Sequence, residues 1–130
     1  MVKLKIITNN PKVCQKYPGA VFCDAGAREV LISARDLVHL GAVIYTHPLS
    51  GNILPGVSPY KSLIISEDDS KTDSSIDPIS LNLIENALAA VKDPPVGFAG
   101  YDEKTLGDFR VLDFDLLDSA MEKRNGLQYV

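Results

Sequence analysis

Polar side chains gather between two apolar runs in the middle of the chain, where they are suited to bind a small anionic or polar ligand. The runs 42–45 and 63–65 each predict a short buried strand. One polar block follows the first run, and another precedes the second. The two blocks contain an imidazole, several hydroxyls and one ammonium, on the residues Thr46, His47, Ser50, Gly51, Tyr60, Lys61 and Ser62.

A third polar block, Thr8, Asn9 and Asn10, follows the first predicted strand, 3–8. Ligands of open α/β sheets bind beyond the carboxyl ends of the strands. If the strands 3–8 and 42–45 are neighbours in one sheet, the polar groups that follow them face each other. We therefore predict one ligand site that combines the three blocks.

His47 is the only group of this region that titrates near neutral pH. A small enzyme with His47 as general acid or base is therefore an alternative to a binding protein. A hydrolase is disfavoured, because Ser50 lies in no Gly-x-Ser-x-Gly elbow and nothing identifies a third group that would orient the imidazole. Structural interpretations also stay open: the imidazole can bond the loop backbone ahead of Pro48, and Ser50 with Gly51 suits an ordinary turn.

Lys61 opens a predicted buried strand, so its ammonium must reach solvent or meet a partner. A bound phosphate or carboxylate would serve, and so would Asp24 or a loop carbonyl. We interpret Asp113, Asp115 and Asp118 as a helix cap and a solvated helix face rather than as paired acids.

No cofactor and no metal site are predicted. The chain has no glycine-rich phosphate loop and no cluster of metal ligands, and the spacing of Cys14 and Cys23 matches no zinc motif. In a reducing cytosol we expect the two cysteines to be small buried thiols, with a regulatory disulfide as the alternative.

Length and composition describe one globular domain, 1–130, with enough chain for a core of its own. Apolar residues make up 45% and charged residues 23% of the chain, which argues against disorder. Thirteen basic and seventeen acidic residues give a net charge of 13 − 17 = −4, so the basic surface that nucleic-acid binding needs is missing. No apolar run of about 18 residues is present, and the start is too short and polar for a signal peptide. We therefore expect a cytoplasmic protein without membrane contact.

The predicted elements suggest an α/β fold. The helical pattern 27–40 lies between the apolar runs 20–23 and 42–45, and such a strand–helix–strand unit is typical of parallel sheets. A second helix is predicted after Asp77, which is a good N-cap. We predict a single three-layer sandwich, in which helices flank a mainly parallel sheet of four or five strands.

The C-terminal part of the chain is harder to assign. The glycine-containing stretch 96–108 predicts an irregular loop, which Phe98 and Tyr101 would pin to the body of the protein. A short strand, 109–112, and a last helix capped by Asp113 are expected to follow.

Several motifs occur together in this chain: Thr8-Asn9-Asn10-Pro11, Thr46-His47-Pro48-Leu49-Ser50-Gly51, Ser58-Pro59-Tyr60-Lys61-Ser62 and Asp113-Phe114-Asp115-Leu116-Leu117. With these motifs the chain resembles the GrdX family, whose small proteins are encoded beside the glycine, sarcosine and betaine reductase complexes of amino-acid-fermenting anaerobes. The stretch Asn52-Ile53-Leu54 is more apolar than the family pattern. The resemblance implies a cytoplasmic accessory protein of the reductase system, and it does not imply that this chain cleaves the substrate.

Three hypotheses of function follow. The first is a non-catalytic accessory protein that binds a small anionic or polar ligand at the predicted site. The second is the small enzyme that uses His47. The third is an interaction module that docks on a reductase component, and a homodimer is compatible with each of the three.

Overall fold

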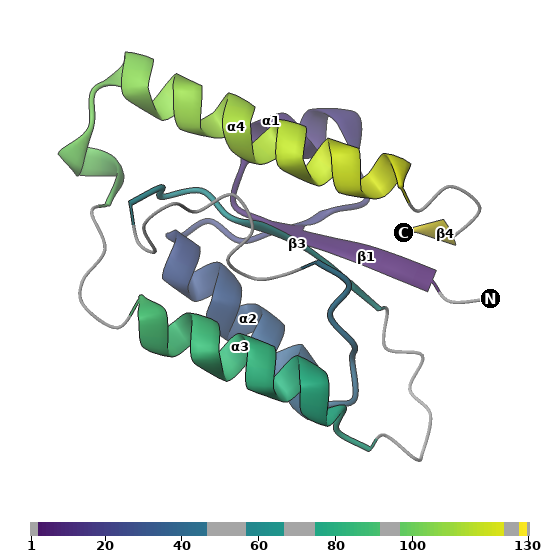
Figure 1. Cartoon of the computed structure of the whole chain (residues 1–130). Coiled ribbons are helices and arrows are strands. Elements are labelled where there is room, and N and C mark those ends of the chain that lie inside the picture. The colour runs from purple at the N-terminus through teal and green to yellow at the C-terminus, as the bar shows by residue number, and fades with distance from the viewer. Residues whose placement is uncertain (1–2, 47–56, 67–74, 92–96, 124–127, 130) are drawn as a thin grey trace.

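The computed structural model describes residues 3–46, 57–66, 75–91, 97–123 and 128–129 of the chain. They form an α/β fold in which a small mixed sheet lies between two pairs of helices (Figure 1). The strands are β1 (Lys3–Thr8), β2 (Val21–Phe22), β3 (Ser62–Ser66) and β4 (Gln128–Tyr129). The helices are α1 (Pro11–Lys16), α2 (Ala27–His39), α3 (Pro78–Ala90) and α4 (Glu103–Glu122), and a 3₁₀ turn, η1 (Phe98–Gly100), precedes α4.

Strand β1 is the centre of the sheet. It pairs antiparallel with β3, from Leu4 opposite Ser66 to Thr8 opposite Ser62, and parallel with β2 and β4. Of the strands that the structure describes, only β1 and β3 are longer than two residues. The predicted three-layer sandwich with a mainly parallel sheet of four or five strands is therefore wrong: helices cover both faces, but the sheet is small and its longest pairing is antiparallel.

The segment 42–45 explains this error. It was expected to be a parallel strand, but it makes a single antiparallel bridge, from Ile44 to Ile65 of β3. Beside the bridge, the Tyr45 N–H donates to the Ile64 carbonyl at 2.8 Å. Strands β1 and β3 thus lie between β2 and this segment, so α2 connects two pieces of chain that are not neighbours. The helical pattern was correctly located. The two segments beside it do not pair with each other, because β2 pairs with β1 and the segment 42–45 pairs with β3.

The two faces of the sheet carry separate groups of buried side chains. Helices α2 and α3 cover one face of the sheet, and α1 and α4 cover the other (Figure 1). Ile7 and Ile65 pack with residues of α2 and α3, whereas Ile6 and Ile64 pack with residues of α1 and α4. All four side chains are at most 1% exposed. Successive strand residues face opposite sides of a sheet, so an uninterrupted apolar run is what a sheet covered on both faces requires.

Helices α2 and α3 confirm the sequence predictions. The carboxylate of Asp77 accepts from the Ser80 N–H at 3.0 Å and from the Ser80 hydroxyl at 2.7 Å, as expected for an N-cap. The hydroxyl of Ser80 in turn accepts from the Ile44 N–H at 2.9 Å, which ties the start of α3 to the segment 42–45. At the end of α2, Gly41 has a φ of 106°, a left-handed conformation that favours glycine.

The C-terminal prediction is wrong in its main point. Residues 103–122 form the single helix α4, so the expected strand 109–112 does not exist and Asp113 lies inside the helix rather than at its cap. The cap is Asp102, whose side chain accepts from the Thr105 N–H at 2.9 Å. Gly107 was read as a loop signal, but packing against α1 and β3 overrides the modest helix cost of one glycine.

Aromatic contacts do attach the segment before α4 to the body, as predicted. The ring of Phe98 lies edge-on to the ring of Tyr60, with 5.2 Å between the centroids. The hydroxyl of Tyr101 donates to the Val57 carbonyl at 2.6 Å.

Candidate functional site

Six of the residues proposed from the sequence lie together where β1 ends and β3 begins. Because β1 and β3 are antiparallel, Thr8 stands directly opposite Ser62. All six are buried, with the exposed fraction of Lys61 only 3%. The residues are Thr8, Asn9, Asn10, Tyr60, Lys61 and Ser62.

A hydrogen-bonded chain of hydroxyls runs through this region and ends on Asp113 of α4. The Asn10 N–H donates to Thr8 Oγ1 at 2.9 Å, and Thr8 Oγ1 lies 2.6 Å from Ser62 Oγ. Ser62 Oγ lies 2.7 Å from Asp113 Oδ2. An ionised carboxylate only accepts, so Ser62 donates to Asp113 and Thr8 donates to Ser62. We call Thr8, Asn10, Lys61, Ser62 and Asp113 the buried polar cluster.

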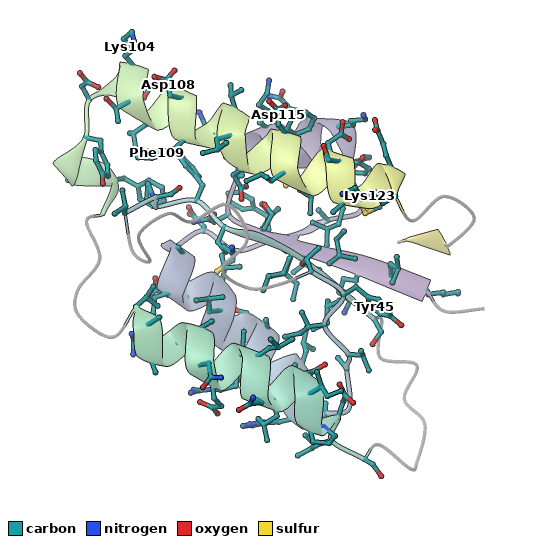
Figure 2. The ribbon with its side chains drawn as sticks, in the orientation of Figure 1. Tyr45, Lys104, Asp108, Phe109, Asp115 and Lys123 are labelled. Atoms are coloured by element: carbon teal, nitrogen blue, oxygen red, sulfur yellow. The ribbon has the colours of Figure 1, made fainter. Side chains whose placement is uncertain are left out.

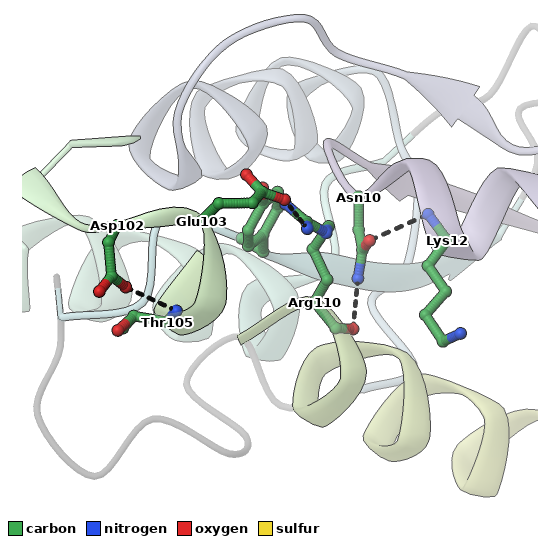
Figure 3. A network of polar contacts seen from close by, with 7 residues as sticks. Asn10, Lys12, Asp102, Glu103, Thr105 and Arg110 are labelled. Carbon is green, nitrogen blue, oxygen red and sulfur yellow. Dashed lines mark hydrogen bonds and ion pairs between the residues drawn. The ribbon is translucent and has the colours of Figure 1, made fainter. Parts of the chain in front are cut away.

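Asn10 joins β1, α1 and α4. Its Oδ1 accepts from the Lys12 N–H at 3.0 Å and thereby caps α1, while its Nδ2 donates to the Arg110 carbonyl at 2.9 Å (Figure 3). The same Nδ2 donates to Asp113 Oδ2 at 3.0 Å. Asp113 Oδ2 therefore accepts from Asn10 as well as from Ser62, which orients the carboxylate inside the cluster.

The side-chain amide of Asn9 also makes several hydrogen bonds, and its partners are backbone groups. Its Nδ2 donates at 2.8 Å to the carbonyls of Ala25 and Pro59, and its Oδ1 accepts at 2.8 Å from the Lys61 N–H. This one buried amide thus holds the turn before α2 and the chain that leads into β3. We conclude that Asn9 is a positioning residue for Lys61 rather than a group that points at a ligand.

Lys61 is buried and Asp113 is partly buried, so both opposite charges have lost contact with water. Burial lowers the pKa of Lys61 to about 8, and the nearby charge of Asp113 opposes this shift. Burial likewise raises the pKa of Asp113, against the hydrogen bonds from Asn10 and Ser62 and the charge of Lys61. For both groups the loss of hydration is the largest influence on the pKa, so burial disfavours the charged form of each side chain.

Tyr60, which precedes Lys61 in the chain, contacts a basic side chain of α4. The guanidinium of Arg110 donates to the Tyr60 hydroxyl at 2.8 Å, lies 5.7 Å from the centroid of the Tyr60 ring, and also pairs with Glu103. The Arg110–Glu103 contact is visible in Figure 3. Two basic side chains, one buried and one with 26% of its side chain exposed, therefore flank Tyr60.

The remaining predicted site residues do not join the cluster in the part of the chain that is described. Thr46 accepts at 3.0 Å from the Ile64 N–H, so its hydroxyl serves the edge of β3. His47, Ser50 and Gly51 lie outside the described residues.

Asp113 is the residue that sequence reasoning missed. It had been interpreted as a cap, but it shares the inner face of α4 with Phe114 and Leu117, which pack against the core. A carboxylate four residues before the buried Leu117 was the available signal. Asp118 was assigned to a solvated face, and it instead pairs with Lys16 at 2.8 Å.

No group of three or more metal-ligating side chains occurs among the described residues. Within the same residues, no helix is long and apolar enough to cross a membrane.

Comparison with known families identifies the chain. The family model described as GrdX-like protein matches residues 5–122. The chain belongs to the GrdX family. No curated protein and no solved structure gave a significant match.

The matched region of this GrdX-like protein extends from β1 to the last residue of α4 and therefore contains the whole buried polar cluster. The hydroxyls of Thr8 and Ser62 are engaged with each other and with Asp113, so they are better arranged to fix geometry than to attack a substrate. Lys61 is the basic side chain of the cluster, and burial is the largest influence on its pKa.

Proposed function

We propose that this GrdX-like protein is a non-catalytic accessory protein of the glycine, sarcosine and betaine reductase system and that it binds a small anionic ligand beside Lys61. The observation that carries the proposal is the burial of Lys61, a residue that is 3% exposed, at the junction of β1 and β3. Family membership supports the association with the reductase system.

Electrostatics favours an anion over other small ligands. Burial raises the free energy of charged Lys61, and Asp113 compensates for it only in part, since the pKa of Lys61 stays well below the ordinary value. An anion close to the ammonium would stabilise its charged form further, because burial is the largest influence on its pKa. Phosphates and carboxylates are the chemical classes that fit.

The arrangement supports binding more than catalysis. Each hydroxyl of the cluster both accepts and donates within the protein, so neither is held as a free nucleophile. The alternative enzyme requires His47, which lies outside the described residues. That alternative predicts a turnover that His47→Asn abolishes while the fold stays intact, and equal turnover of the variant and the wild type would contradict it.

The first test is a calorimetric titration with inorganic phosphate, acetate, acetyl phosphate, glycine, sarcosine and betaine at pH 7. We expect at least one phosphate or carboxylate to bind the wild type and to lose at least tenfold in affinity with Lys61→Met. Above about pH 8 the free protein loses the Lys61 charge, so the Kd for phosphate or acetate is expected to rise about tenfold per pH unit.

The matched control is Lys104→Met, which removes a positive charge from a side chain that is 88% exposed. This variant should bind as the wild type does. Equal affinity of Lys61→Met and wild type, or a Kd that does not change across pH 8, would contradict the proposal.

A further inference from the structure

Helix α4 is attached to the protein by a narrow face. Of its 20 residues, only Leu117 is buried, whereas α2 has five buried residues over 13 positions. On the side away from the core, Val111, Leu112 and Leu116 are 46%, 47% and 40% exposed. The longest helix of the described chain therefore presents large apolar side chains to solvent, which is a common mark of an interaction surface.

A row of carboxylates accompanies these side chains. Asp108, Asp115 and Glu122 are all exposed and follow each other at intervals of seven residues. Residues seven apart lie almost above one another on a helix, about 10.5 Å apart along the axis. Figure 2 shows Asp108 and Asp115 on the side of α4 that points away from the sheet. One exposed face of α4 thus combines an apolar stripe with an acidic row.

We propose that this outer face, formed by Asp108, Val111, Leu112, Asp115, Leu116 and Glu122, docks onto an amphipathic helix of another protein that carries lysine or arginine beside its apolar stripe. Leucine side chains of the partner pack on Leu112 and Leu116. Its basic side chains, repeating every seven residues, lie opposite the carboxylates.

The acidic row favours a basic helix of another protein over a second copy of this chain as the partner. Two copies packed through α4 would bring two acidic rows together, and like charges across an interface oppose association. Within α4, Lys104 pairs with Asp108 at 3.9 Å, and both side chains are largely exposed. Such an exposed pair is worth little, so Asp108 is available to a better placed partner.

This inference is independent of the proposed anion site. None of the residues of the outer face belongs to the buried polar cluster, and Asp108, Asp115 and Glu122 lie on the side of α4 away from Asp113, which contacts that cluster. The test of anion binding can therefore fail while the test of peptide docking succeeds, and docking can fail while anion binding succeeds.

The test uses two synthetic 18-residue helical peptides with the same leucine stripe, one flanked by lysines every seven residues and the other by glutamates. Fluorescence anisotropy should show that the full chain binds the lysine peptide at least tenfold more tightly than the glutamate peptide. Leu112→Gln with Leu116→Gln should reduce the affinity at least tenfold, and Asp115→Asn with Glu122→Gln should weaken binding and its dependence on salt.

Two control variants carry equivalent changes elsewhere. Leu40→Gln alters a leucine that is 55% exposed at the end of α2, and Asp36→Asn with Glu85→Gln removes two acidic charges from α2 and α3. Both should bind the lysine peptide as the wild type does. The proposal is overturned if the controls lose affinity to the same degree, if the two peptides bind equally, if neither binds, or if the chain instead forms dimers that the Leu112 and Leu116 changes dissolve.

Discussion

The free energy of unfolding of the wild-type protein is expected to rise by roughly 3 kcal/mol between about pH 8 and pH 10.5. Replacing Lys61 by methionine should remove this rise. The pKa of Lys61 is about 8 in the folded protein and has its ordinary value, 10.5, in the unfolded chain. Between these values the unfolded state binds more protons than the folded state, so stability increases as the pH rises through this window. Below about pH 8 both states carry the charge, and the cost of burying it is fully present.

Urea unfolding followed by circular dichroism at several pH values between 7 and 10.5 measures this effect. The informative quantity is the difference between Lys61→Met and wild type, because other groups titrate equally in both proteins. The free energy of unfolding of Lys61→Met minus that of the wild type should fall by roughly 3 kcal/mol as the pH rises from about 8 to 10.5. The difference between Lys104→Met and wild type should stay constant, since that side chain is solvated. A constant difference for Lys61→Met as well would show that the ammonium is not held in a dry site.

Replacing Asn9 by alanine is expected to lower the free energy of unfolding by at least about 3 kcal/mol. The change removes three hydrogen bonds at once and leaves the carbonyls of Ala25 and Pro59 and the N–H of Lys61 without their side-chain partner. Each buried polar group that loses its partner costs about 1–3 kcal/mol. Chemical denaturation at pH 7 with a common m-value measures the loss.

The nearly isosteric change Asn9→Asp makes the test sharper. An aspartate still accepts from the Lys61 N–H, but it turns a second oxygen toward two carbonyl oxygens where the amide had donated. It should therefore destabilise at pH 7 at least as much as alanine does. Asn82→Ala, on an exposed position of α3, should change stability by less than about 0.5 kcal/mol. A loss of similar size at both asparagines would indicate that the Asn9 contacts do not stabilise the fold.

Elements marked by strong local signals were predicted well. The strand 3–8, the helical pattern 27–40 and the Asp77 cap appear in the structure as β1, α2 and the start of α3. Capping and helical periodicity act within a few residues, so they can be recognised without knowing what lies nearby. The GrdX resemblance was confirmed for the same reason, since it depends on short motifs.

The order and direction of the strands were not accessible in this way. The segment 42–45 and β1 each had a plausible place in a parallel sheet, but β3 inserted between them in the antiparallel direction. A strand that is apolar on both faces fits either direction. The choice depends on which segments the tertiary fold brings into contact, and no local pattern encodes it.

The candidate site shows the same division between local and long-range information. Thr8, Asn10, Lys61 and Ser62 could be selected in advance, because polar residues at the ends of buried strands stand out by their type and position. Asp113 could not be selected, because it lies 51 residues beyond Ser62 and its importance arises only when α4 packs over β3. That packing removes water from Lys61 and Asp113 together. The resulting loss of hydration lowers the pKa of Lys61 and raises the pKa of Asp113.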